Sequence, residues 1–151
     1  IHPFKEFKRR LVTLEEYAKR VKLPLIADKK YGLTDFVRKV AFNEAKRCSI
    51  CYEMRLDNVA QFASKNNFEA FSTTLLYSTY QNHSLLISTC ENLSSKYGVP
   101  FIYEDFRVGW QIGIDESKEQ EMYRQPYCGC IYSEQERYDK SLRKSNPKKQ
   151  V

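Results

Sequence analysis

The sequence predicts an α/β fold with a mostly parallel sheet. Helical and strand-like segments alternate along the chain in the order helix, strand, helices, strand, helix, strand, helices. Such alternation is typical of folds in which helices cover a parallel sheet. The 151 residues, of which 42% are hydrophobic and 29% charged, fit one globular domain. We expect that single α/β domain to span residues 1–143, followed by a basic flexible tail over residues 144–151.

The first predicted element is an amphipathic helix. Apolar residues recur at steps of three and four positions from Phe4 to Val21, and Pro3 suits a first helical turn. The apolar residues 23–27 predict a short buried strand. Thr34 is a suitable cap for a second helix, over the apolar residues that follow it.

A third helix is expected to begin at two closely spaced cysteines, Cys48 and Cys51, and to end at Asn66. Residues 68–76 follow, and their aromatic and Thr side chains predict a strand. The polar segment 78–83 then connects this strand to the next helix.

A helix is predicted over residues 85–96, with Gly98 as the left-handed residue that terminates it. Cys90 lies on the apolar stripe of this helix, so we expect it in the core. Residues 99–103 predict the third strand. The remaining predicted elements are a loop around Gly109 and Gly113, an acidic helix from Glu116 to Met122, and a last helix from about Ser133.

Four of the five cysteines form two tight pairs, Cys48-Ser-Ile-Cys51 and Cys128-Gly-Cys130. Thiolates select zinc, copper(I) or iron–sulfur clusters. Four of them are the usual ligands of a [4Fe–4S] cluster or of a structural zinc ion. Disulfides and ordinary buried cysteines are the alternatives. The sequence starts without a signal peptide and has no apolar run that could span a membrane. We therefore expect a cytoplasmic protein with reduced cysteines.

The net charge of +6 and the isoelectric point near 9.0 permit nucleic-acid binding without requiring it. Arg47 precedes the first cysteine pair and Arg124 the second. Positive charge near a thiolate cluster would stabilise it, while solvated charges or surface ion pairs are the alternative. The sequence contains no G-x-G-x-x-G or P-loop motif, so a standard dinucleotide or P-loop site has no support.

Five segments of the sequence resemble the QueH-type epoxyqueuosine reductases. These segments are Arg47-Cys48-x-x-Cys51-Tyr52-x-x-Arg55-Leu56, Phe71-Ser72-Thr73-Thr74-Leu75-Leu76, Tyr80-Gln81-Asn82-His83, Asp105-Phe106-Arg107 and Tyr123-Arg124-Gln125-x-Tyr127-Cys128-Gly129-Cys130-Ile131-Tyr132-Ser133. The opening residues 1–6 also resemble the start of a helix in that family. The resemblance spans nearly all of residues 1–138, and the segment around Cys-Gly-Cys is its specific part.

The resemblance implies a function and a fold. The family reduces epoxyqueuosine to queuosine at the tRNA wobble position, in the last step of queuosine biosynthesis. It is cobalamin-independent and carries an iron–sulfur cluster with an additional metal ion, iron, nearby. By the same resemblance, Cys48, Cys51, Cys128 and Cys130 would bind the [4Fe–4S] cluster. The implied catalytic domain is a Rossmann-like, nucleotide-hydrolase-like sheet flanked by helices.

The family normally begins with a short strand and a Cys-Cys segment that also serves the metal site. That stretch would lie before Ile1, and the sequence does not contain it. We therefore expect the assignment of the four cluster thiolates, and the ligands of a second metal, to depend on residues outside this sequence.

Residue type alone suggests four candidate acids that could protonate the epoxide oxygen, while a metal acts on that oxygen as a Lewis acid. They are Tyr80, His83, Asp105 and Tyr127. Each has a simpler alternative role. The two tyrosines could serve in packing or hydrogen bonding, His83 could cap the following helix, and Asp105 could pair with Arg107.

A wobble nucleotide lies in a single-stranded loop whose bases can be splayed out and stacked on aromatic side chains. Arg47, Arg107 and Arg124 are the candidate RNA-binding residues, and Tyr123 and Tyr127 interleave with the last of them. Further candidates for phosphate contacts are the first helix and Lys140, Arg143, Lys144, Lys148 and Lys149. The expected partners are a tRNA anticodon loop carrying epoxyqueuosine and a reduced electron-donor protein, with no membrane.

Two other functions fit the same residues. A zinc-stapled RNA-binding module without catalysis would use all four thiolates, and zinc in place of iron and sulfide would reveal it. A thiol redox enzyme would work through Cys48 and Cys51 alone. Its activity would survive loss of Cys128 and Cys130, whereas the reductase would lose activity with either pair.

Overall fold

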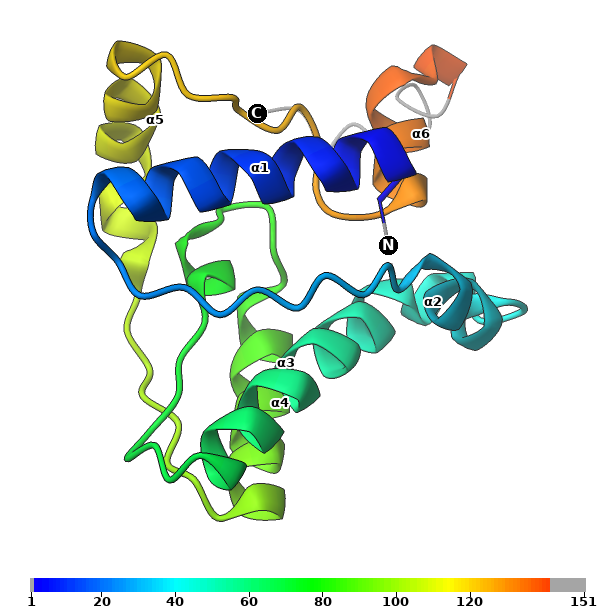
Figure 1. The fold of residues 1–151 in the computed structure, drawn as a ribbon. Coiled ribbons are helices and arrows are strands. Elements are labelled where there is room, and N and C mark those ends of the chain that lie inside the picture. The colour runs from blue at the N-terminus through cyan, green and yellow to red at the C-terminus, as the bar shows by residue number, and fades with distance from the viewer. Residues whose placement is uncertain (1, 142–151) are drawn as a thin grey trace. The chain divides into compact units, whose positions relative to one another are not determined.

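The computed structural model describes residues 2–141, and the regular elements within them are helices (Figure 1). The α-helices are α1 (Phe4–Arg20), α2 (Leu33–Val40), α3 (Arg47–Lys65), α4 (His83–Tyr97), α5 (Trp110–Glu119) and α6 (Ile131–Tyr138). Short 3-10 helices are η1 (Glu44–Lys46), η2 (Thr74–Tyr77) and η3 (Phe106–Gly109). The chain divides into two compact units. Unit 1 is Ile1–Val37 with Gln120–Val151, and unit 2 is Arg38–Glu119.

The predicted α/β fold is wrong. Residues 2–141 contain no strand, and the β pairing seen among them is an isolated parallel bridge between Phe71 and Phe101. The Phe71 N–H donates to the Pro100 carbonyl, and the Ile102 N–H donates to the Phe71 carbonyl, each over 2.9 Å. A mostly parallel, Rossmann-like or nucleotide-hydrolase-like sheet is therefore not part of the described chain.

Two local features prevent this bridge from growing into a sheet. Pro100 has no N–H to donate to a ladder. Beyond Phe71 the chain leaves the extended conformation after Thr73, whose side chain accepts from the Leu75 N–H over 3.2 Å and caps η2. The first predicted strand, residues 23–27, has no regular structure, and its Ile26 is 75% exposed.

The apolar residues that predicted strands are used for helix packing instead. Phe71 and Val99 belong to the core of unit 2, which is built mainly from α3 and α4. A short apolar run cannot by itself distinguish a strand from a buried connecting segment. The extent of a single domain over residues 1–143 stays a prediction, and the predicted tail over 144–151 lies outside the described residues.

In unit 1, α1 confirms the helix predicted from the apolar spacing. The Pro3 carbonyl accepts from the Phe7 N–H over 3.0 Å, which satisfies a donor of the first turn. Glu6 in the first turn and Arg20 in the last turn complement the helix dipole. Lys22 has a left-handed φ of 55°, and the chain leaves the helix there.

The other helices of this region begin earlier than predicted. Thr34 does not cap α2, because it is the second residue of a helix that begins at Leu33. Phe36 of this helix is fully buried, and its ring meets the edge of the Tyr132 ring of α6 at 6.4 Å between centroids. The final helix α6 begins at Ile131, close to the predicted start at Ser133.

In unit 2, α3 and α4 lie side by side and form the core (Figure 1). Leu56 and Ala60 of α3 and Leu86 and Cys90 of α4 are at most 1% exposed. Each fully buried Leu contributes about 1.5–3 kcal/mol of burial free energy. The prediction that Cys90 lies in the core is confirmed, and burial raises the pKa of its thiol to about 11.

The ends of these two helices were also predicted correctly. α3 terminates at Asn66, and the following Asn67 has a φ of 55°. Gly98 terminates α4 with a φ of 66°, in the left-handed region that favours glycine.

The loop predicted around Gly109 and Gly113 is helical instead, since η3 ends at Gly109 and α5 spans Trp110–Glu119. Gly113 is required for a close approach. A Cβ atom there would overlap the Tyr77 hydroxyl oxygen. The glycine that contributed to the loop prediction therefore allows a close contact between Gly113 and Tyr77 within unit 2.

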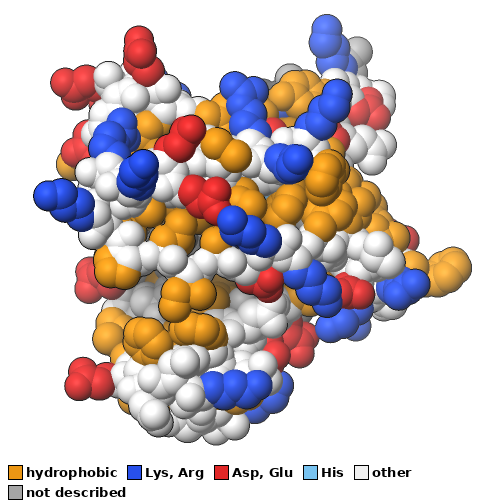
Figure 2. Space-filling model, in the orientation of Figure 1, with side chains coloured by type: hydrophobic (Ala, Val, Ile, Leu, Met, Phe, Trp, Pro, Cys, Tyr) orange, Lys and Arg blue, Asp and Glu red, His pale blue; other side chains and the backbone are white. Residues whose placement is uncertain are grey.

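Figure 2 shows basic side chains interspersed with acidic and hydrophobic ones on the face in view. Several large apolar side chains are exposed, including Phe42 at 98% and Val108 at 89%. None of the helices in the described part of the chain combines the length and hydrophobicity needed to cross a bilayer.

Candidate active site

The first cysteine pair lies in the first turn of α3. Cys48 and Cys51 are one helical turn apart, so both side chains project from one face of the helix. Cys51 is only 8% exposed, whereas Cys48 is exposed to solvent. Arg47, the first residue of the helix, reaches back to the Glu44 carbonyl over 3.5 Å.

Tyr52 connects this helix to the polar segment 78–83. Its hydroxyl donates to Gln81 Oε1 over 2.8 Å and accepts from the Asn82 N–H over 3.1 Å. Asn82 in turn caps α4, accepting from the Leu85 N–H over 3.0 Å. The segment ahead of α4 is thus fixed to the helix that carries the first cysteines, and Asn82 rather than His83 is the cap.

Asp105 and Arg107 form a bidentate ion pair. Arg107 Nε and Nη2 donate to the two carboxylate oxygens over 2.8 and 2.6 Å, and its backbone N–H donates over 3.1 Å. These hydrogen bonds hold the pKa of Asp105 far below its usual range and raise the pKa of Arg107. Asp105 is therefore ionised at neutral pH and is not a proton donor there.

His83 lies at the edge of the same ion pair. Its Nε2 is 3.9 Å from Asp105 Oδ1 and 3.3 Å from the Leu76 carbonyl oxygen. Its ring meets the edge of the Tyr103 ring at 5.8 Å. Asp105 can orient the imidazole electrostatically, so the structure brings two of the predicted candidate acids together.

Tyr80 is the most exposed of the four candidate acids, at 64%. Its ring meets the edge of the Trp110 indole at 5.7 Å. The centre of the Tyr77 ring lies 5.0 Å from the centre of the same indole, and the Tyr77 hydroxyl donates to the Trp110 carbonyl over 2.9 Å. Sequence reasoning missed Trp110, although a lone tryptophan beside a glycine-bearing segment could have indicated it.

The second cysteine pair directly precedes α6. Cys130 is 7% exposed and occupies the N-cap position of that helix. Its N–H donates to Ser133 Oγ over 3.2 Å, and the Ser133 hydroxyl donates to the Cys130 carbonyl over 2.6 Å. Gly129 is buried between the two cysteines, while Cys128 is partly exposed.

Tyr127 lies beside this pair with its hydroxyl turned toward α6. The hydroxyl donates to Glu134 Oε1 over 3.3 Å, and the ring meets the Tyr138 ring at 6.2 Å. Burial, and then the negative charge of Glu134, raise the pKa of Tyr127 well above its usual value. The phenol therefore keeps its proton at neutral pH, and that proton is directed at a carboxylate.

Helix α1 contributes a network that sequence reasoning missed. Arg10 donates from Nη1 to the Cys128 carbonyl over 3.1 Å and from Nη2 to the Tyr127 carbonyl over 3.2 Å. Glu6 accepts from Arg10 Nε over 2.6 Å and from the Tyr123 hydroxyl over 2.7 Å. The spacing of Glu6 and Arg10, one helical turn apart, was the one signal available in the sequence.

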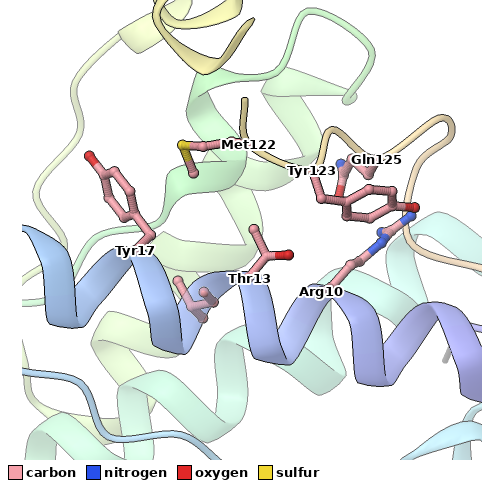
Figure 3. Close-up of a pocket in the computed structure, with 7 residues that line it drawn as sticks. Arg10, Thr13, Tyr17, Met122, Tyr123 and Gln125 are labelled. Carbon is pink, nitrogen blue, oxygen red and sulfur yellow. The ribbon is translucent and has the colours of Figure 1, made fainter. Parts of the chain in front are cut away.

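A pocket of about 200 Å³ adjoins this network in unit 1 (Figure 3). Arg10 and Tyr123 belong to both, and Figure 3 shows them approaching each other above α1. The lining residues are Arg10, Thr13, Leu14, Tyr17, Met122, Tyr123 and Gln125.

The predicted site residues divide between the two units. Unit 2 contains Arg47, Cys48, Cys51, Tyr80, His83, Asp105 and Arg107, and unit 1 contains Arg124, Tyr127, Cys128 and Cys130. Among the described residues, no three Cys, His, Asp or Glu side chains come close enough to hold a metal ion. Each unit contains one cysteine pair, and no disulfide involves any of the five cysteines, all of which are described.

The predicted RNA-binding residues differ in their surroundings. Arg124 and Lys140 are exposed, Arg107 is engaged with Asp105, and Arg47 is partly buried. The other basic candidates for phosphate contacts, Arg143, Lys144, Lys148 and Lys149, lie outside the described residues.

Comparison with known proteins decides between the candidate functions. The model of one family, described as epoxyqueuosine reductase QueH, matches residues 1–136. The chain belongs to this family. The resemblance noted in the sequence is thereby confirmed, and the protein is an epoxyqueuosine reductase, an oxidoreductase.

Relatives in this family cover most of the chain. The epoxyqueuosine reductase QueH of Dehalococcoides mccartyi is 36% identical over 140 residues, which cover 93% of this chain and 77% of the relative. The epoxyqueuosine reductase QueH of Thermotoga maritima is 35% identical over 153 residues, which cover 93% of this chain and 78% of the relative. That of Haemophilus influenzae is 31% identical and covers 88% of this chain but 57% of the relative.

Proposed function

We propose that this reductase holds an iron–sulfur cluster through Cys48, Cys51, Cys128 and Cys130. The observation that carries this proposal is the matching form of the two pairs. Each pair lies at the start of a helix and combines one buried thiol, Cys51 or Cys130, with one more accessible thiol. Four soft thiolates are a complete ligand set for a [4Fe–4S] cluster.

The substrate in this proposal is a tRNA that carries epoxyqueuosine at the wobble position. The exposed Tyr80 and the partly buried Trp110 form an aromatic surface in unit 2 that could stack an unpaired base. Arg124 is exposed beside the second cysteine pair and is available for a phosphate contact.

The reaction consumes two electrons and two protons. Both carbon–oxygen bonds of the epoxide break, a carbon–carbon double bond forms, and the oxygen leaves as water. A cluster held by these cysteines would supply the electrons, received from a reduced donor protein. The side chains of this chain must therefore supply protons and hold the nucleotide.

Tyr80 is the proton donor that fits these requirements best. Asp105 is ionised by its ion pair with Arg107, and Tyr127 directs its proton at Glu134. His83 is 12% exposed at its side chain and lies between Asp105 and the Leu76 carbonyl. Tyr80 is 64% exposed and lies in the segment that Tyr52 fixes to the first cysteine helix.

The test replaces each cysteine pair separately, as Cys48→Ser with Cys51→Ser and as Cys128→Ser with Cys130→Ser. Cys90→Ala is the control, because Cys90 is fully buried in the core and belongs to neither cysteine pair. Protein reconstituted without oxygen is assayed on tRNA containing epoxyqueuosine, and its iron and sulfide are measured.

We expect either pair variant to lose both cluster and activity, and the control to keep both. Activity that survives loss of Cys128 and Cys130 would instead indicate a thiol redox enzyme. Zinc without sulfide in every active preparation would rule out the cluster.

A further inference from the structure

We propose that Arg10 is a positioning residue that holds the Cys128–Cys130 loop in its metal-binding conformation. This inference rests on the proposed role of these cysteines as cluster ligands. Arg10 belongs to α1, and 118 positions separate it from Cys128 in the sequence.

The hydrogen bonds of Arg10 restrain the backbone at Cys128. Its two terminal nitrogens donate to the carbonyls of Tyr127 and Cys128, which are consecutive residues. In an extended strand, consecutive carbonyls point to opposite sides. Binding both to one planar guanidinium therefore fixes the φ and ψ angles of Cys128, and with them the direction of its Cα–Cβ bond.

Glu6 holds the guanidinium in the required orientation. Arg10 and Glu6 are only 15% and 13% exposed at their side chains, and their closest atoms are 2.6 Å apart. Glu6 is itself fixed by the Tyr123 hydroxyl. Arg9 also contacts Tyr123, because its guanidinium lies 3.7 Å from the centre of the Tyr123 ring.

The geometry favours this role over a contact with an RNA phosphate. Each of the three guanidinium nitrogens of Arg10 already donates a hydrogen bond within unit 1. A lysine at this position would retain the charge but could not make the planar, forked contact. The loop therefore requires the two hydrogen bonds of the planar guanidinium, and not only its positive charge.

The experiment compares Arg10→Met, Arg10→Lys and Glu6→Gln with the control Arg20→Met. Arg20 lies on the same helix and also donates to an oxygen of unit 1, Gln120 Oε1, over 2.6 Å. The first readout is the rate at which iodoacetamide alkylates each cysteine in metal-free protein, followed by mass spectrometry. Cys90 serves as an internal reporter of unfolding, because it is fully buried.

We expect the two Arg10 variants to alkylate Cys128 and Cys130 about tenfold faster than wild type, given the strength of hydrogen bonds from charged donors. Glu6→Gln should show a smaller increase. Arg20→Met should match wild type, and Cys90 should stay slow throughout. Unchanged rates at Cys128 and Cys130 in both Arg10 variants would overturn the proposal. Fast alkylation of Cys90 as well would assign Arg10 to general stability, which also overturns it.

The second readout is the iron and sulfide content after reconstitution, with the reduction potential of whatever cluster forms. Both Arg10 variants should hold several-fold less cluster than Arg20→Met. If Arg10→Lys has full cluster content and the wild-type reduction potential, positive charge at this position suffices. That result would overturn the proposal that the two guanidinium hydrogen bonds position the loop. Wild-type protein that binds no cluster would overturn the proposed function and this inference together, whereas a loaded wild type with equally loaded variants overturns the inference alone.

Discussion

The hydroxyl of Tyr52 lies 2.8 Å from Gln81 Oε1 and joins the helix that carries Cys48 and Cys51 to the segment that leads into α4. The same hydroxyl accepts from the Asn82 N–H. A buried side chain, 3% exposed, thereby links the first cysteine pair to Tyr80 within one compact unit.

Tyr52→Phe should lower the free energy of unfolding by about 1–3 kcal/mol, because it removes the hydrogen bond to Gln81 Oε1 and the one from the Asn82 N–H. Urea unfolding followed by circular dichroism measures this change. Tyr103→Phe, at a tyrosine that is 47% exposed, is the control and should change stability by less than about 0.5 kcal/mol. Equal, small effects of both variants would contradict the role assigned to Tyr52.

Gly113→Ala should destabilise the protein by about 1–3 kcal/mol, as overpacking does. At an ordinary helical position the same change would stabilise by about 1 kcal/mol, so the sign is informative. The added Cβ would meet the Tyr77 hydroxyl, which is held on the Trp110 carbonyl. The change in stability is measured by thermal unfolding of Gly113→Ala and of the double variant that combines it with Tyr77→Phe. Stabilisation by Gly113→Ala alone would contradict the contact.

Glu6 should make stability depend on pH in the acid range. Burial raises the pKa of Glu6, but the hydrogen bonds from Tyr123 and Arg10 outweigh burial and place the pKa below its ordinary value of 4.5. A carboxylate with a lowered folded-state pKa contributes stability that is complete above that ordinary value and is lost as the pH falls through the folded-state pKa.

The measurement is the free energy of unfolding of wild type and Glu6→Gln between about pH 3 and about pH 7. The difference between the two proteins should shrink as the pH falls below the ordinary value of 4.5. Asp57, whose pKa is lowered by its hydrogen bond from Lys96, is present in both proteins and cancels in the difference. A difference that is constant over this range would contradict the network around Glu6.

Tyr80→Phe should lower kcat on tRNA containing epoxyqueuosine by about a hundredfold or more, as expected for loss of a proton donor. The affinity for tRNA should change little, because the ring that stacks is kept. Tyr103→Phe is the matched control among the exposed tyrosines of unit 2. A Tyr80→Phe enzyme with the wild-type kcat would show that another group donates the proton.

The helices were the part of the fold that the sequence could predict. The apolar spacing from Phe4 onward indicated α1, and Gly98 indicated the end of α4, because both signals are local. The sheet was predicted wrongly because Phe71 and Val99 suit a strand as well as they suit the core between helices. Pro100 and the turn at Thr73 limit the pairing to one bridge, and which segments meet at that bridge depends on contacts between residues distant in the sequence.

The candidate site was predictable as far as residue types allowed. The two cysteine pairs and the ion pair of Asp105 with Arg107 could be anticipated from short segments, whereas the position of His83 beside Asp105 could not. The contact of Arg10 with the carbonyl of Cys128 could not, since backbone acceptors leave no mark on the sequence of a loop.

The most direct test of the central claim is the iron, acid-labile sulfide and zinc content of the wild-type protein purified without oxygen, with its absorption spectrum. The four-thiolate proposal predicts about four irons and four sulfides per chain, with an absorption band that dithionite bleaches. Stoichiometric zinc without sulfide, persisting after an attempt to reconstitute the cluster, would contradict it.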